Sequence, residues 1–99
     1  MKVFKVGEPI RFGVLYKSIF TNEKHFECYY SPLINPLSKT HVVGSFIKDN
    51  DWYWTPVFYI FSPQKYIITI VNKRTNEEFK EVFEVISDIF DKNDDIVIL

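Results

Sequence analysis

The sequence of 99 residues has no alanine, only one cysteine and only three glycines. A lone cysteine, Cys28, excludes a disulfide framework within the chain and a zinc site built from four cysteines. With so few glycines there is no Gly-rich phosphate-binding loop, and the catalytic motifs GxSxG and HExxH are missing as well. These absences favour a protein that is not an enzyme and that carries no cofactor or metal.

The absence of alanine accompanies many Ile, Lys, Asn, Phe and Tyr residues, which is typical of coding in an AT-rich genome. A virus, a phage or a low-GC microbe fits this bias. A long apolar run is missing from the N-terminus, where MKVFKVGEP carries Lys2 and Lys5. We therefore expect neither a signal peptide nor a membrane span, and the single thiol fits a reducing, cytoplasmic setting.

A strong net charge is also missing, since the whole chain carries −1. Such a chain has no bulk field to attract nucleic acid, and we do not expect nucleic acid as a partner. The charge is unevenly spread: residues 1–76 hold ten Lys or Arg and five Asp or Glu, a net of +5, whereas residues 77–99 hold two and eight, a net of −6. The acidic C-terminal part is either a solvated face or a surface that docks on something basic, such as the body of another copy.

The length predicts a single domain covering residues 1–99. Alternation of apolar and polar side chains predicts strands at residues 10–16, 25–30, 41–47, 52–61 and 66–71. The last of these is apolar on both faces, so we expect it at the centre of a sheet. Residues 31–37 contain two prolines and are predicted to form a loop that leaves Leu33 and Ile34 available for contact.

The C-terminal third predicts a helix. Phe79, Phe83, Ile86 and Phe90 recur at the helical period, and Thr75 with Glu78 has the spacing of a capping box. We expect an amphipathic helix over about residues 75–92, followed by a final strand at Ile96–Leu99 or by an extended tail. The predicted fold class is α+β: a mostly antiparallel sheet or partly open barrel with one C-terminal helix.

This layout resembles the pleckstrin-homology-like superfold. The stretches RFGVLYKS, KHFECYYS and VFYIFSPQKYIITI look like strands of that fold, and TNEEFKEVFEVISDIF looks like its capping helix. The resemblance implies a module that binds a peptide or an anionic headgroup. The opening FKVGEPIRFGVLYK also looks like the first strands of an immunoglobulin-like β-sandwich, an alternative that requires residues 79–86 to form a strand.

The side chains that could carry chemistry do not form a recognisable site. His25 and Cys28 would point to opposite faces of a strand, and Asp49 and Asp51 lack the glycine and closing glutamate of a calcium loop. We therefore expect no catalytic residues and no metal ligands. Cys28 is expected to be a small core residue.

The strongest candidate for binding is the aromatic group Trp52, Tyr53 and Trp54, with Leu33 and Ile34 in the preceding loop. On a strand, Trp52 and Trp54 share one face and Tyr53 takes the other, so the group can supply both core and contact surface.

We expect a small intracellular non-enzymatic binding protein that acts through protein–protein contact, such as an accessory or inhibitor protein of a virus or mobile element. A two-fold homodimer is also expected, because the aromatic content is high for so small a surface. The first alternative is a pleckstrin-homology-like ligand-binding module, and the second is a small enzyme of unknown class.

Overall fold

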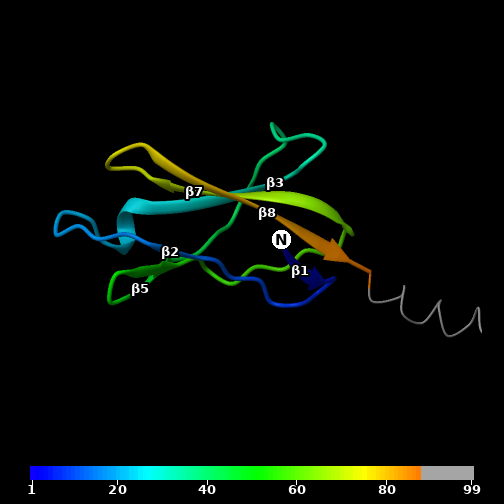
Figure 1. Ribbon diagram of the computed structural model, residues 1–99, viewed down its shortest axis with the longest axis horizontal. Coiled ribbons are helices and arrows are strands. Elements are labelled where there is room, and N and C mark those ends of the chain that lie inside the picture. Colours follow the sequence, from blue (N-terminus) through cyan, green and yellow to red (C-terminus); the bar gives the residue numbers. More distant parts are fainter. Residues whose placement is uncertain (88–99) are drawn as a thin grey trace, which may run out of the picture.

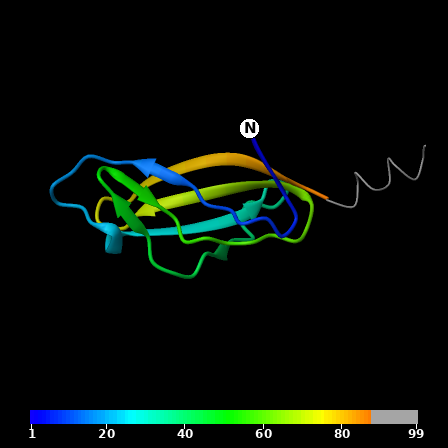
Figure 2. The same cartoon turned by 90° about the horizontal axis from the view of Figure 1, so that it is seen from below.

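The computed structural model describes residues 1–87, which form two β-sheets packed face to face (Figure 1). The five-stranded sheet has the order β1-β8-β7-β3-β4 and the three-stranded sheet the order β2-β6-β5. The first contains β1 (Lys2–Lys5), β3 (Phe26–Pro32), β4 (Thr40–His41), β7 (Gln64–Asn72) and β8 (Glu77–Ile86). The second contains β2 (Gly13–Leu15), β5 (Ile47–Asp49) and β6 (Trp52–Trp54), and a 3₁₀ turn, η1 (Glu23–His25), precedes β3. In Figure 2, seen from below, the green β5–β6 hairpin lies in front of the longer strands.

The helix predicted over residues 75–92 is wrong, because Glu77–Ile86 forms strand β8. Along β8, Phe79, Phe83 and Val85 turn toward the core. Phe79 and Phe83 fit both a period of 3.6 and a period of two, whereas Ile86, also predicted to be buried, lies on the other face of the strand. Strand β7 pairs with every residue from Glu77 to Val85. Long-range pairing of this kind overrides a local helical preference, since it satisfies the backbone and buries the same side chains.

The apparent capping box at Thr75 is part of a hairpin turn. Asn76 has a φ of 65°, and the backbone N–H groups of Thr75 and Asn76 both donate to the carbonyl of Asn72. The backbone N–H of Glu77 in turn donates to Oγ1 of Thr75. The expected burial of Phe90 and the expected strand at Ile96–Leu99 lie outside the described residues.

The protein is therefore nearly all β in the described part, and the predicted α+β class is corrected. In immunoglobulin constant-type sandwiches, strands A, B, E and D form one sheet and strands C, F and G the other. Here β2, β6 and β5 form one sheet and β3, β7 and β8 the other, with β4 added beside β3. Strand β1 pairs in parallel with β8, with Lys2 opposite Phe83, and was not predicted.

The expected central position of the strand at residues 66–71 is confirmed by β7, which is third of five in its sheet. Three other predicted strands are shorter than expected. The strand predicted at residues 10–16 covers only Gly13–Leu15. The segment after His41 leaves the five-stranded sheet and crosses to the other sheet, with Gly44 at a φ of 134°. Strand β6 ends at Trp54, just before Pro56, and Phe58 then forms an isolated bridge with Ile10.

The core lies between the sheets and is rich in aromatic rings. Phe83 is fully buried and its ring centroid lies 5.1 Å from Phe12, 5.6 Å from Tyr66 and 5.9 Å from Phe4. Cys28 is fully buried as predicted, and desolvation raises the pKa of its thiol to about 12. The core thus ties β1, β3, β7 and β8 to the segment leading into β2.

One polar contact joins the two sheets at the end of the sandwich near the β7–β8 turn. The hydroxyl of Tyr16 donates a hydrogen bond to Oε1 of Glu77. This bond, with a second from the side chain of Thr75, lowers the pKa of the Glu77 carboxyl below its ordinary value of 4.5. The folded state therefore favours the ionised form of Glu77. The contribution of this carboxylate to the stability of the fold is present above pH 4.5 and is lost as the pH falls through the lowered pKa.

Replacing Tyr16 by phenylalanine should raise the pKa of Glu77 toward its ordinary value, because the donor is removed. As the pH falls from the ordinary pKa to the lowered pKa, the free energy of unfolding should decrease more for the wild type than for Tyr16→Phe. An NMR titration of the Glu77 carboxyl carbon measures the shift. Tyr29→Phe is the matched control, since the Tyr29 hydroxyl bonds Glu27 instead. An unchanged Glu77 pKa in Tyr16→Phe would contradict this account.

Candidate binding surface

The outer side of the three-stranded sheet carries an apolar surface centred on two tryptophans. Trp52 and Trp54 point outward from β6, with ring centroids 5.6 Å apart and planes inclined by 21°. Leu15 on β2 lies opposite Trp52, and Ile47 on β5 lies opposite Trp54. We call Leu15, Ile47, Trp52 and Trp54 the tryptophan face. Trp52 is 42% exposed, Leu15 51% and Ile47 52%.

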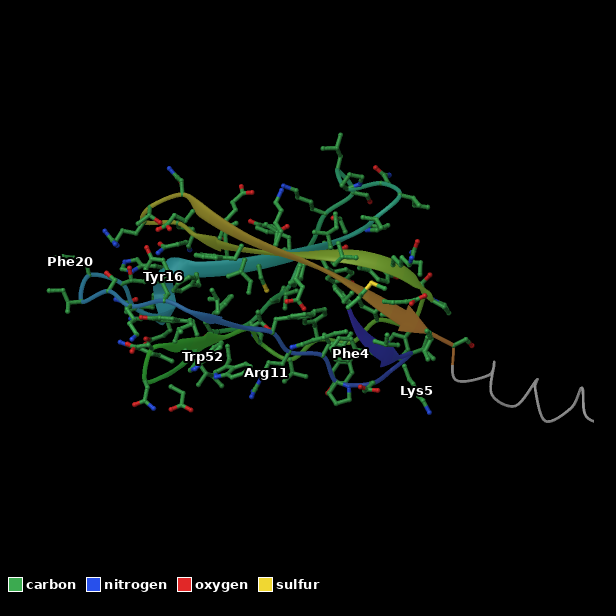
Figure 3. All side chains as sticks on the ribbon, in the orientation of Figure 1. Phe4, Lys5, Arg11, Tyr16, Phe20 and Trp52 are labelled. Carbon is green, nitrogen blue, oxygen red and sulfur yellow. The ribbon has the colours of Figure 1, made fainter. Side chains whose placement is uncertain are left out.

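Local sequence explains why these side chains meet. A Cβ atom at Gly13 would lie 2.6 Å from Cζ3 of Trp54, so the glycine leaves room for the indole to lie over β2. On the other side, Asn50 takes a φ of 56° in the turn that joins β5 to β6. Asparagine tolerates that conformation, and the tight turn sets the register that places Ile47 beside Trp54. In Figure 3, Trp52 and the exposed Arg11 both lie on the outer side of this sheet.

Tyr53 points the other way and belongs to the core. Its side chain is 0% exposed, and its hydroxyl donates a 2.9 Å hydrogen bond to the carbonyl of Thr21. Its ring centroid lies 4.5 Å from that of Phe26 on the facing sheet. Of the three predicted aromatic contact residues, the structure therefore leaves Trp52 and Trp54 on the surface and gives Tyr53 a structural role.

Leu33 and Ile34 do not join the tryptophan face. They follow β3 in the loop that leads to β4, where the backbone N–H of Leu33 donates to the carbonyl of Lys65. Figure 1 shows this loop, in teal, above the five-stranded sheet, whereas β5 lies at the bottom of the view. Ile34 is 89% exposed, and it lies apart from the tryptophan face.

Sequence reasoning missed four surface residues. Leu15 and Ile47 were assigned to alternating strands, and only the strand register shows that they flank the tryptophans. Ile19 and Phe20 are exposed at the tip of the loop after β2, labelled at Phe20 in Figure 3. The Arg74 guanidinium lies 5.9 Å from the centroid of the Phe20 ring, and its Nε donates to Oγ1 of Thr21.

Cys28 and His25, two side chains that often carry chemistry in proteins, have structural places in residues 1–87. The Cys28 thiol is buried and protonated, because its pKa is raised, so it is not a nucleophile at neutral pH. The Nδ1 atom of His25 accepts a hydrogen bond from the backbone of Asn22 within a turn. Within this described part, no three His, Cys, Asp or Glu side chains are grouped so that they could hold a metal ion.

A hollow of about 490 Å³ lies beside β3 and the segment after β4. Its lining mixes charges of both signs: Lys24 and Lys73 stand with Glu23 and Glu27, beside the side chain of His41. Mixed charge of this kind selects no single class of small ligand.

Comparison of the chain with protein-family models, with curated proteins and with solved structures gave no match. Among residues 1–87 there is no helix of the length and apolar character needed to cross a membrane.

Proposed function

We propose that this is a non-enzymatic binding protein whose tryptophan face docks on an apolar surface of another protein. One observation carries the proposal: two stacked indoles and two half-exposed aliphatic side chains form one continuous patch on the outside of a sheet. Aromatic side chains provide a large contact area and lose little conformational entropy when they bind. A contiguous exposed apolar patch is a feature of interaction sites on soluble proteins.

The backbone behind the patch supports this role. Tyr53, between the two tryptophans, is locked into the core by its hydrogen bond to Thr21 and its contact with Phe26. Both neighbours of β6 are hydrogen-bonded strands. The indoles are thus held in place before a partner arrives, which lowers the entropic cost of association.

An accessory or inhibitor protein of a virus or mobile element remains our proposal for the biological setting, and composition alone supports it. The AT-rich bias of the sequence fits such an origin, and a surface that occupies a partner is sufficient for that role. The expected two-fold homodimer stays a prediction.

The test compares Trp52→Ala with Ile34→Ala. Both replace an exposed apolar side chain, but Ile34 lies outside the tryptophan face. We expect immobilised Trp52→Ala to bind its protein partners at least about 2 kcal/mol more weakly than the wild type, roughly a thirtyfold loss of affinity. Ile34→Ala should bind like the wild type, and both variants should unfold within about 1 kcal/mol of it.

Equal partner capture by the wild type and Trp52→Ala would sink the proposal. Light scattering on the same samples distinguishes a foreign partner from a second copy. If the wild type is a dimer and Trp52→Ala is a monomer, the tryptophan face binds a second copy. Retention of the wild type on anionic vesicles, with no protein partner, would instead support the alternative of a headgroup-binding module. The exposed Ile19 and Phe20 beside Arg74 would then be the contact.

A further inference from the structure

One side of the sandwich has two neighbouring strand edges that no strand in residues 1–87 covers. Strand β2 pairs only with β6, and β1 covers only residues 83–86 of β8. The outer edge of Glu77–Val82 therefore has no partner strand in the described part of the chain. Figure 2 shows β2 and β8 along the same upper margin of the molecule.

The backbone of this uncovered stretch is oriented for pairing. The N–H of Val6 donates to the carbonyl of Ile86, so even-numbered residues of β8 direct their backbone groups away from β7. The N–H and C=O groups of Glu78 and Lys80 consequently face outward, as does the N–H of Val82, whose carbonyl lies at the end of β1 next to Lys2. Odd-numbered residues point their backbone groups into the β7 ladder. The free edge thus offers a row of donors and acceptors at the spacing that a further strand requires.

The space beside this edge is apolar and bounded. A hollow of about 80 Å³ opens between the sheets and is lined by Phe12 and Val14 from one side and Ile68, Ile70 and Phe79 from the other. At one end stands β1, where Nζ of Lys2 lies 5.2 Å from the centroid of the Phe12 ring. At the other end, Tyr16 reaches across to Glu77. An added strand would place alternate side chains over this apolar floor.

The charge of the edge indicates what kind of strand would fit. Residues 77–82 contain three glutamates and one lysine, a net charge of −2. Nζ of Lys80 lies 3.5 Å from Oε1 of Glu78, so these two charges form an ion pair. Glu81 is exposed and lines the hollow. Two copies of this edge would bring together two segments that each carry −2, whereas a basic segment brings the opposite charge. A basic segment is therefore favoured over a second copy.

We propose that the Glu77–Val82 edge of β8 binds an extended segment of a partner protein as an added β-strand, and that this segment alternates apolar residues with Lys or Arg. The backbone ladder supplies affinity, the hollow takes the apolar side chains, and the acidic edge selects the basic ones. This surface is distinct from the tryptophan face and does not rest on the function proposed for it.

The probe is a capped seven-residue peptide that alternates valine and lysine, VKVKVKV. Titrated into the ¹⁵N-labelled full chain, it should shift the amide signals of Glu78, Lys80 and Val82 and protect those amides from hydrogen exchange. The charge-reversed peptide VEVEVEV should bind about tenfold more weakly or worse. Trp52→Ala should bind the VKVKVKV peptide as the wild type does, so that the two surfaces are tested separately.

Lys80→Pro and Lys80→Ala form the decisive pair of variants. Both remove the same charge, but only proline removes the outward N–H, and that N–H takes no part in the β7 ladder. Lys80→Pro should lose at least about tenfold in affinity for the peptide, whereas Lys80→Ala should bind at least as well as the wild type. Thermal unfolding of both variants checks that the sandwich is intact.

Three results would overturn the proposal. The first is equal binding by Lys80→Pro and Lys80→Ala with both folded. The second is the absence of any shift at Glu78, Lys80 and Val82 at every peptide concentration reached. The third is full exchange protection of the Lys80 and Val82 amides in the free protein, which would mean that the edge is already covered.

Discussion

Phe83→Ala is expected to lower the free energy of unfolding by about 3–5 kcal/mol. Phe83 is fully buried and touches rings from three other segments, so its removal leaves a cavity that none of them can fill without moving. Urea unfolding followed by tryptophan fluorescence measures the change. The contacts with Phe4 and Tyr66 place this loss at the junction of β1, β7 and β8.

Val82→Ala is the matched control for Phe83. A helix over residues 75–92 would bury both side chains on one face, whereas β8 buries Phe83 and leaves Val82 partly exposed on the other side of the sheet. The strand therefore predicts a loss of no more than about 1 kcal/mol for Val82→Ala. Comparable losses for the two variants would contradict the strand, and so would a loss below about 1 kcal/mol for Phe83→Ala.

Tyr53→Ala is expected to be about as damaging, at roughly 3–5 kcal/mol, because the ring is fully buried against Phe26. Tyr53→Phe keeps the ring and removes only the donor to the Thr21 carbonyl, so it should cost about 1–3 kcal/mol. Thermal and urea unfolding give both values.

The neighbouring residue provides the contrast. Trp52→Ala should change the stability by no more than about 1 kcal/mol, since the indole is on the outer side of the sheet. Two adjacent residues of β6 would then have different roles, Tyr53 in stability and Trp52 in binding. If Trp52→Ala were as destabilising as Tyr53→Ala, the tryptophan face would be a structural layer and not a contact surface.

The sequence by itself determined which side chains are core or surface where the pattern is local. The alternation in Trp52–Trp54 required Tyr53 to face away from both tryptophans, and the structure has this arrangement. The apolar residues on both faces of 66–71 indicated a central strand, and the lone Cys28 indicated a core residue. In each case one residue type and the strand period suffice, because side-chain direction follows from the backbone of the same segment.

Only the tertiary structure decided whether residues 77–86 form a helix or a strand and which side chains make up the tryptophan face. Phe79 and Phe83 are spaced so that both a helix and a strand would place them on one face, and local propensity cannot separate the two. The long partner strand β7 settled the choice by pairing nearly the whole of β8. Leu15 and Ile47 reach Trp52 and Trp54 through pairings with β2 and β5, and Ile34 is carried away with the other sheet. Such pairings join residues far apart in the chain, so their energies are set by the whole fold and not by any window of sequence.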